Sequence, residues 1–279
     1  MNPRFSANPI DDFNQLTSFP FMVNALEAGT IVAVLAAVVG SYVVLRRQTF
    51  ASHTLSVMAF PGAAGAALAG LPVALGYYVA CAAAALTLGR AGTSGRHGRA
   101  VESAAIGTVQ TVGLAAGFLF LSLNRSILDG PETLLFGTFL GITRDQVLVL
   151  LTVTAASLAA LTVLARPLLF ASVDRDVAGA SGVPVRLLDA AFLLILGLAI
   201  AAVSQLTGAL LVFALLVAPA ASAQLITMRP LAGLCLSVAL GLLVTWVGLT
   251  IAYFTIYPVG FCVTTLAFAI YLVTRIARH

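Results

Sequence analysis

Lysine is absent from this 279-residue chain, and all fourteen of its basic residues are arginine. Charged residues of both signs make up 9% of the sequence, against about 25% in an ordinary soluble domain. So little charge excludes a water-soluble globule, and the apolar share of 61% indicates a chain whose solvent is lipid. The formal net charge of +4 does not indicate a nucleic-acid partner, because the arginines fall in short segments between apolar runs.

Cysteine is also scarce. Cys81, Cys235 and Cys262 are scattered through apolar runs, which excludes a disulfide framework and any cysteine-based metal spacing. The chain has no G-x-x-x-x-G-K-[ST] loop either, and therefore no usual means of cradling nucleotide phosphates. We expect no permanently bound cofactor and no catalytic activity of its own.

Long apolar runs are what the chain does contain. Residues 1–20 are polar and lack the design of a signal peptide, so we expect the first apolar run to be retained. The fold class we predict for residues 21–279 is all-α, a polytopic bundle of about nine membrane helices. The second span is interrupted by Pro61-Gly62 and is expected to be broken or partly re-entrant. The predicted spans are 22–45, 54–70, 72–89, 103–123, 146–165, 187–204, 207–227, 231–254 and 259–274.

The arginines predict the orientation. With nine spans, eleven arginines fall on the side of the C-terminus and three on the side of the N-terminus. Because basic loops stay in the cytoplasm, we expect an outside N-terminus and a cytoplasmic C-terminus in a multi-pass protein of a bacterial plasma membrane. The eleven are Arg46, Arg47, Arg90, Arg96, Arg99, Arg166, Arg175, Arg186, Arg229, Arg275 and Arg278; the three are Arg4, Arg125 and Arg144.

Two connecting segments are more than linkers. The outer segment 124–145 has an apolar stretch too short to cross a bilayer and is expected at the outer rim. In the inner segment 166–186, Asp174 can cap a short helix that Gly182 and Pro184 terminate. Such a helix, near 174–182, could dock into a groove of a soluble partner or could be a solvated loop, and its spacing alone supports both interpretations equally.

Several motifs in order resemble the permease subunits of metal-type ABC importers. They are "FMVNALEAGTIVAVLAAVVGSYVVLRRQTFASHTL", "LLFGTFLGIT", "LLFASVDRDVAGASGVPV", "QLTGALLVFALLVAPAASAQLIT" and "YPVG". The resemblance implies a homodimer around a central pathway, a separate cytosolic ATPase and an extracytoplasmic metal-binding protein. It also implies that the stretch 168–185 is the coupling helix that engages the ATPase, with Phe170, Asp174, Asp176, Ala178 and Gly182 as its candidate residues.

The resemblance fails at the ion site itself. Members of the family place an Asp where this chain has His53 and a His where it has Val57, and residues four apart on one helix face can chelate one cation. Here the carboxylate and the chelating pair are both lost. Two copies of His53 across a two-fold axis, with Thr49 or Ser56, could still pass zinc more readily than manganese. The alternative is an interfacial histidine bonded to a backbone carbonyl.

Other polar residues in the spans carry weaker signals. Glu27 lies close enough to the outer end to reach water. Gln205 could line the outer mouth or bond across the neighbouring turn, and Ser222 and Gln224 could face the pathway or bond between helices. His97 and His279 do not have the setting of ligands.

The sequence therefore leaves three functions open. The first is a permease for a divalent metal, with zinc slightly ahead of manganese and iron. The second is an ABC permease for a metal chelate such as a siderophore or cobalamin, which would need no protein ligands. The third is a secondary transporter, which would call for inverted repeats or carboxylates inside the membrane.

Overall fold

The computed structural model describes residues 18–91, 99–124, 134–137, 142–209 and 211–278. Its described part is built from nine long helices and one short one, and no strand occurs in it. The helices are α2 (Pro20–Leu45), α3 (Thr49–Leu68), α4 (Val73–Ala91), α5 (Arg99–Leu123), α7 (Arg144–Val173), α8 (Arg175–Ala180), α9 (Val185–Thr207), α10 (Val212–Ile226), α11 (Pro230–Phe254) and α12 (Val259–Ile276).

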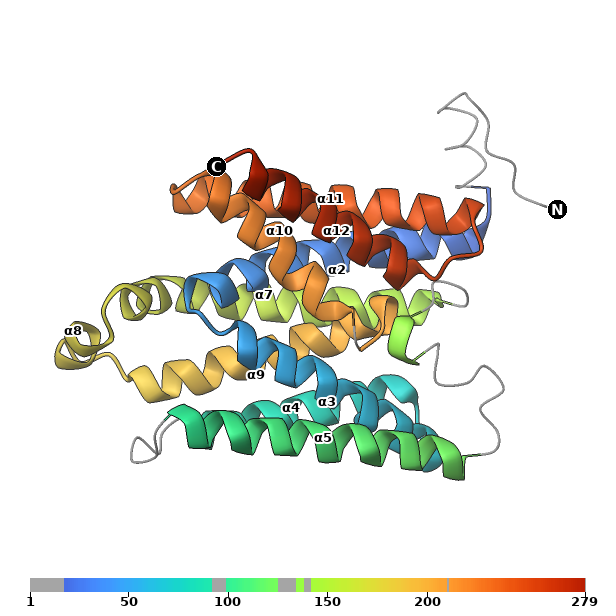
Figure 1. Ribbon diagram of the computed structural model, residues 1–279, viewed down its shortest axis with the longest axis horizontal. Coiled ribbons are helices and arrows are strands. Elements are labelled where there is room, and N and C mark those ends of the chain that lie inside the picture. Colours follow the sequence, from blue (N-terminus) through green and yellow to red (C-terminus); the bar gives the residue numbers. More distant parts are fainter. Residues whose placement is uncertain (1–17, 92–98, 125–133, 138–141, 210, 279) are drawn as a thin grey trace.

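Consecutive long helices run in opposite directions, so the bundle has two ends (Figure 1). The turns after α2, α7 and α10 and the end of α12 lie at one end, on the left of the picture, and the turns after α3, α9 and α11 lie at the other. Each of the nine predicted spans corresponds to one long helix, and the fold class predicted from the sequence is confirmed.

Seven of the described helices are long and apolar enough to cross a membrane, and α3 and α10 are not among them. Helix α10 has only 15 residues, which gives a length of about 22 Å at the usual rise per residue. Both helices are packed among others, α3 against α4, α5 and α9, and α10 against α2, α11 and α12. Helix α10 is apolar, and it is only its length that falls short of a full span.

Local signals set the ends of the helices. Pro20 and Pro230 stand at the first turns of α2 and α11, where a missing N–H costs nothing. Thr143 and Gln146 form a reciprocal capping box that starts α7.

Two expectations about helix lengths were wrong. Helix α3 continues through Pro61 rather than breaking there, because α4 and α5 pack along its length. Helix α7 continues through Pro167 to Val173, so the first eight residues of the segment 166–186 are helical. The outer segment 124–145 lies largely outside the described residues, as do residues 1–17.

Glycines allow the closest approaches between elements. Gly62 of α3 and Gly76 of α4 meet backbone to backbone, since a Cβ built on Gly76 would lie 2.2 Å from the Gly62 carbonyl oxygen. In the turn after α9, Gly208 has a φ of 77°. A Cβ on Gly208 would lie 2.3 Å from the carbonyl oxygen of Leu135. These contacts fix α3 on α4 and the segment 134–137 on the α9–α10 turn.

Candidate ion path and coupling element

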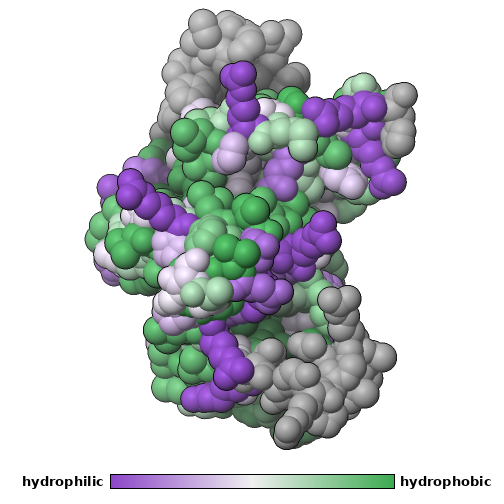
Figure 2. Space-filling model, turned by 90° about the vertical axis from the view of Figure 1, so that its left-hand side faces the viewer, coloured by the Kyte–Doolittle hydropathy of each residue, from purple (hydrophilic) through white to green (hydrophobic). Residues whose placement is uncertain are grey.

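The bundle has one basic end. The described arginines that the sequence assigns to the cytoplasm lie in or near the turns at the end that carries α8 (Figure 1). Figure 2 faces this end and shows hydrophilic side chains spread across it among apolar ones. Arg96 and Arg125 lie outside the described residues. The distribution of charge is the one expected of a membrane protein with this end in the cytoplasm.

His53 lies in the second turn of α3, close to the basic end. Its side chain is exposed on the single chain and stands edge-on to the ring of Phe213, with ring centroids 5.4 Å apart. Val57, one turn further along, is only 5% exposed. A residue at position 57 therefore packs inside the bundle, and position 53 is the one open to an ion or to a second copy of the chain.

The other two candidate ligands differ from each other. Thr49 opens α3 and is half-buried. Ser56 is buried, and its hydroxyl donates a 2.8 Å hydrogen bond to the carbonyl of His53. In the part of the chain that the structure describes, no three His, Cys, Asp or Glu side chains gather as a metal site. His53 therefore belongs to no such group within one chain's described residues.

A left-handed turn holds the start of α3. Arg47 has a φ of 55°, and the N–H groups of Gln48 and Arg47 donate to the carbonyls of Val43 and Val44. This is a Schellman motif, in which glycine is the usual residue at the left-handed position. An arginine there costs on the order of 1 kcal/mol relative to glycine, so packing of α2 and α3 must hold the turn in place.

The short helix α8 forms as the sequence predicts. The Asp174 carboxylate accepts from the N–H groups of Asp176 and Val177 at 3.0 Å. At the other end Gly182 has a φ of 85°, and the N–H of Val183 donates to the Ala178 carbonyl, closing a second Schellman motif. Both predicted boundaries are confirmed.

The side chains of α8 divide into two faces. Ala178 is fully buried against the rest of the chain, so it anchors the helix and is not on a docking surface. Asp176, Val177, Gly179 and Ala180 are exposed, as is Phe170 in the last turn of α7. A partner would meet the exposed face.

Asp189 is the residue that sequence reasoning missed. It lies in the second turn of α9, and its two carboxylate oxygens are bound by different arginines, Oδ1 by Arg46 and Oδ2 by Arg175. A signal was available, since Asp189 is an acid just inside a span whose flanking segments carry arginines. Sequence spacing could not show that arginines 143 and 14 residues away converge on it.

The two arms of this network differ in burial. The Arg46 side chain is 4% exposed and that of Asp189 19%, whereas Arg175 is 61% exposed. The Arg46 guanidinium also lies over the ring of Phe192, 5.1 Å from its centroid. Burial lowers the pKa of Arg46 and the Asp189 carboxylate raises it, and the guanidinium remains charged.

The remaining polar residues are engaged within the chain. Gln205 donates to the Tyr78 hydroxyl of α4 at 3.1 Å, not across the neighbouring turn. Gln224 donates to the Ser41 carbonyl of α2, and Ser222 to the Ala218 carbonyl of its own helix. Glu27 pairs with Arg144 near the outer end, and both side chains are well exposed.

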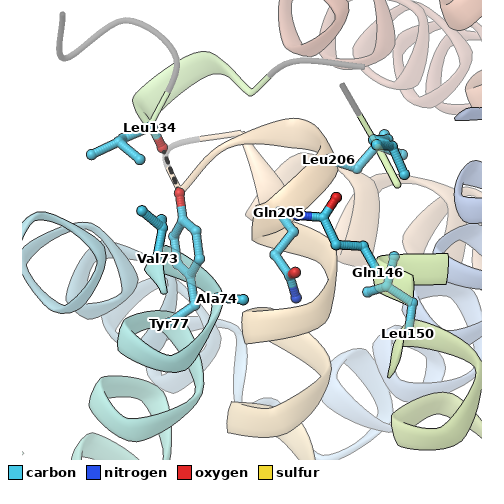
Figure 3. A pocket seen from close by; sticks show the side chains of 9 residues that line it. Val73, Ala74, Tyr77, Leu134, Gln146, Leu150, Gln205 and Leu206 are labelled. Carbon is cyan, nitrogen blue, oxygen red and sulfur yellow. Dashed lines mark hydrogen bonds between the residues drawn. The ribbon is translucent and has the colours of Figure 1, made fainter. Parts of the chain in front are cut away.

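A cavity of about 160 Å³ lies at the end opposite α8. Figure 3 shows Gln205 and Gln146 extending into it, with the Tyr77 hydroxyl bonded to the Leu134 carbonyl at its rim. Helices α4, α7 and α9 and the segment around Leu134 line it. Gln205 thus borders an open space at this end, in addition to tying α9 to α4.

This arrangement of apolar helices and charge defines a multi-pass membrane protein. The chain belongs to the ABC 3 transport family, whose model matches residues 18–278. It is 29% identical over 244 residues to the manganese transport system membrane protein MntC of Halalkalibacterium halodurans, covering 88% of this chain and 82% of that protein. It is 31% identical over 257 residues to the chelated iron transport system membrane protein YfeC of Yersinia pestis, covering 91% and 85%.

The fold agrees with a solved structure. The structure of PsaBC from Streptococcus pneumoniae in complex with Fab matches with a TM-score of 0.83 and 26% identity, over 95% of this chain and 94% of that one. The chain is therefore a membrane component of a transport system of this family.

Proposed function

We propose that the chain is the permease subunit of an ABC importer for divalent metal ions, with zinc ahead of manganese and iron. Two copies form the path, a cytosolic ATPase binds at α8, and an extracytoplasmic binding protein delivers the ion. The names of the relatives support a metal cargo, since they transport manganese and chelated iron. The imidazole of His53 supports zinc, because manganese prefers carboxylate oxygen.

The observation that carries this proposal is the exposure of His53 on α3 in a chain matched to the family along nearly its whole length. An exposed imidazole beside an apolar ring gains a partner when a second copy faces it across a two-fold axis. Two imidazoles leave positions on the metal open for water, as a site that must release its ion requires.

The test uses the complete transporter in liposomes, with radioactive zinc and manganese as probes. Loss of a group that only supports a metal ligand typically lowers affinity or activity roughly tenfold to hundredfold. The His53→Ala variant removes the ligand itself and should lower zinc uptake by more than that. Assembly with the ATPase should be unchanged. His97→Ala is the matched control and should transport normally.

Restoring the family pair gives a second comparison. His53→Asp with Val57→His should retain transport and favour manganese, because a carboxylate oxygen returns to the site. Since Val57 is buried, the new imidazole must displace neighbouring side chains, and thermal stability has to be measured alongside uptake.

The rivals give different results. A chelate importer would transport an iron chelate and be indifferent to His53→Ala, which would overturn the metal-ion proposal. A secondary transporter would work without ATP and stop when a proton ionophore is added. Against it, Glu27 and Asp189 both form ion pairs and lie near helix ends in the described chain.

A further inference from the structure

The three-residue network of Arg46, Asp189 and Arg175 joins three elements at the basic end. Asp189 belongs to α9, Arg175 is the first residue of α8, and Arg46 caps the end of α2. Each carboxylate oxygen of Asp189 takes one arginine, so the two arms do not compete for the same atom. A single carboxylate thereby connects α8 to α2.

The connection continues into the helix that carries His53. After Arg46, the left-handed Arg47 and then Gln48 lead directly into α3, which begins at Thr49. Hydrogen bonds from Arg47 and Gln48 back to the last turn of α2 make this passage a rigid corner. A displacement of Arg46 is therefore delivered to the first turn of α3, a few residues from His53.

The two arms have unequal strength for a physical reason. Arg46 is buried, so losing Asp189 would leave an uncompensated charge, which proteins tolerate poorly. Its packing over Phe192, three residues along α9 from Asp189, fixes it further. Arg175 is mostly exposed and can exchange its carboxylate for water at little cost. The link to α2 is therefore the costlier of the two to break, and the link to α8 can open at little cost.

We propose that Asp189 is a positioning residue that transmits movement of α8 to the corner between α2 and α3, and so to the ion path at His53. This inference rests on the proposed function, since it presumes that an ATPase moves α8. Asp189 touches neither the ion nor the nucleotide, and it acts through Arg46.

The test compares metal uptake with ATP hydrolysis in the complete transporter in liposomes, with manganese and zinc as probes. Asp189→Asn keeps the shape of the side chain and removes its charge. We expect the variant to assemble and to hydrolyse ATP, with metal taken up per ATP lowered at least tenfold. Asp189→Glu should restore most of the coupling. Arg175→Gln, at an exposed position, should lower coupling too, and adding it to Asp189→Asn should cause little further loss.

The control is Glu27→Gln, the same chemical change in the ion pair of α2 at the opposite end, which should leave the ratio of uptake to hydrolysis unchanged. An unaltered ratio in Asp189→Asn and in Arg175→Gln would overturn the inference. If the unsubstituted transporter moves neither metal, the proposed function fails instead, so the two failures are distinct.

A second measurement needs no cargo. In a Cys-free variant, spin labels at the exposed positions Leu45 and Ala180 report the distance between the end of α2 and α8. The distribution of distances should broaden in Asp189→Asn and in Arg175→Gln, and stay narrow in Glu27→Gln. If the distribution of distances is the same in all three variants, packing alone holds α8 and the inference is overturned. This measurement decides the matter even where Asp189→Asn does not assemble with the ATPase.

Discussion

Gly208 illustrates how much a single position contributes at the end opposite α8. Its φ of 77° and the nearby Leu135 carbonyl leave no room for a side chain. Gly208→Ala should therefore lower the free energy of unfolding by about 2 kcal/mol or more, from backbone strain and the clash together. Thermal unfolding in detergent measures the loss.

The matched control is Gly107→Ala in α5. A Cβ on Gly107 meets nothing within 4 Å and its φ is not positive, so the change should be neutral or stabilise by up to about 1 kcal/mol. Equal effects of the two substitutions would show that the turn after α9 can rearrange around a side chain.

At the residue scale the sequence predicted types of interaction better than partners. It identified Asp174 as a cap, because capping depends on neighbours only three residues away. It did not identify Asp189, nor Tyr78 as the partner of Gln205, because both contacts depend on helices distant in the sequence. The role of His53 stays a prediction, since a second copy of the chain would complete its site.

Among the elements, α8 gives the sharpest prediction. Ala180→Arg places a long charged side chain on its exposed face and should abolish co-purification of the ATPase while the chain folds normally. Asp174→Ala removes the cap, costs about 1 kcal/mol of helix stability and should weaken the association only partly.

Ala178→Arg serves as the comparison within the same helix. Because Ala178 is fully buried, this change should destabilise the chain itself and lower its yield. Normal co-purification with Ala180→Arg would show that the partner binds elsewhere.

At the element scale, the apolar runs predicted the number of long helices but not all their lengths. Pro61 and Pro167 are strong breakers in isolation, yet α3 and α7 run through them. Inside a bundle, neighbouring helices and side chains compensate for the lost hydrogen bond. The ends of α8 at Asp174 and Gly182 were predicted because cap residues act locally.

For the whole molecule, the orientation is the first matter to test. Met228 and Ile256 flank α11 at its two ends and are 91% and 97% exposed. Each cysteine is introduced into a Cys-free variant of the protein in intact cells. A thiol reagent that cannot cross the membrane should label Ile256→Cys and spare Met228→Cys. The opposite labelling would reverse the assignment of the basic end to the cytoplasm.

Pairing of two copies is the second matter at this scale. If two His53 side chains share one ion, His53→Cys in the Cys-free variant should place two thiols within reach of one soft cation. Mercuric ion should then bridge two chains into a dimer visible on a denaturing gel without thiols. Thr250→Cys, at a half-buried position of α11, is the control and should stay monomeric under the same treatment.

Pro61 gives α3 a mechanical character of its own. It has no N–H, so the carbonyl of Val57 lacks the donor that an unbroken ladder would supply, and the helix is pliable there. The half beyond Pro61 is clamped to α4 through Gly62 and Gly76. The part before it carries His53, eight residues or about 12 Å from Pro61. A tilt of about 10° would carry the imidazole roughly 2 Å sideways, enough to open or close the space around a single ion without unfolding any part of the bundle.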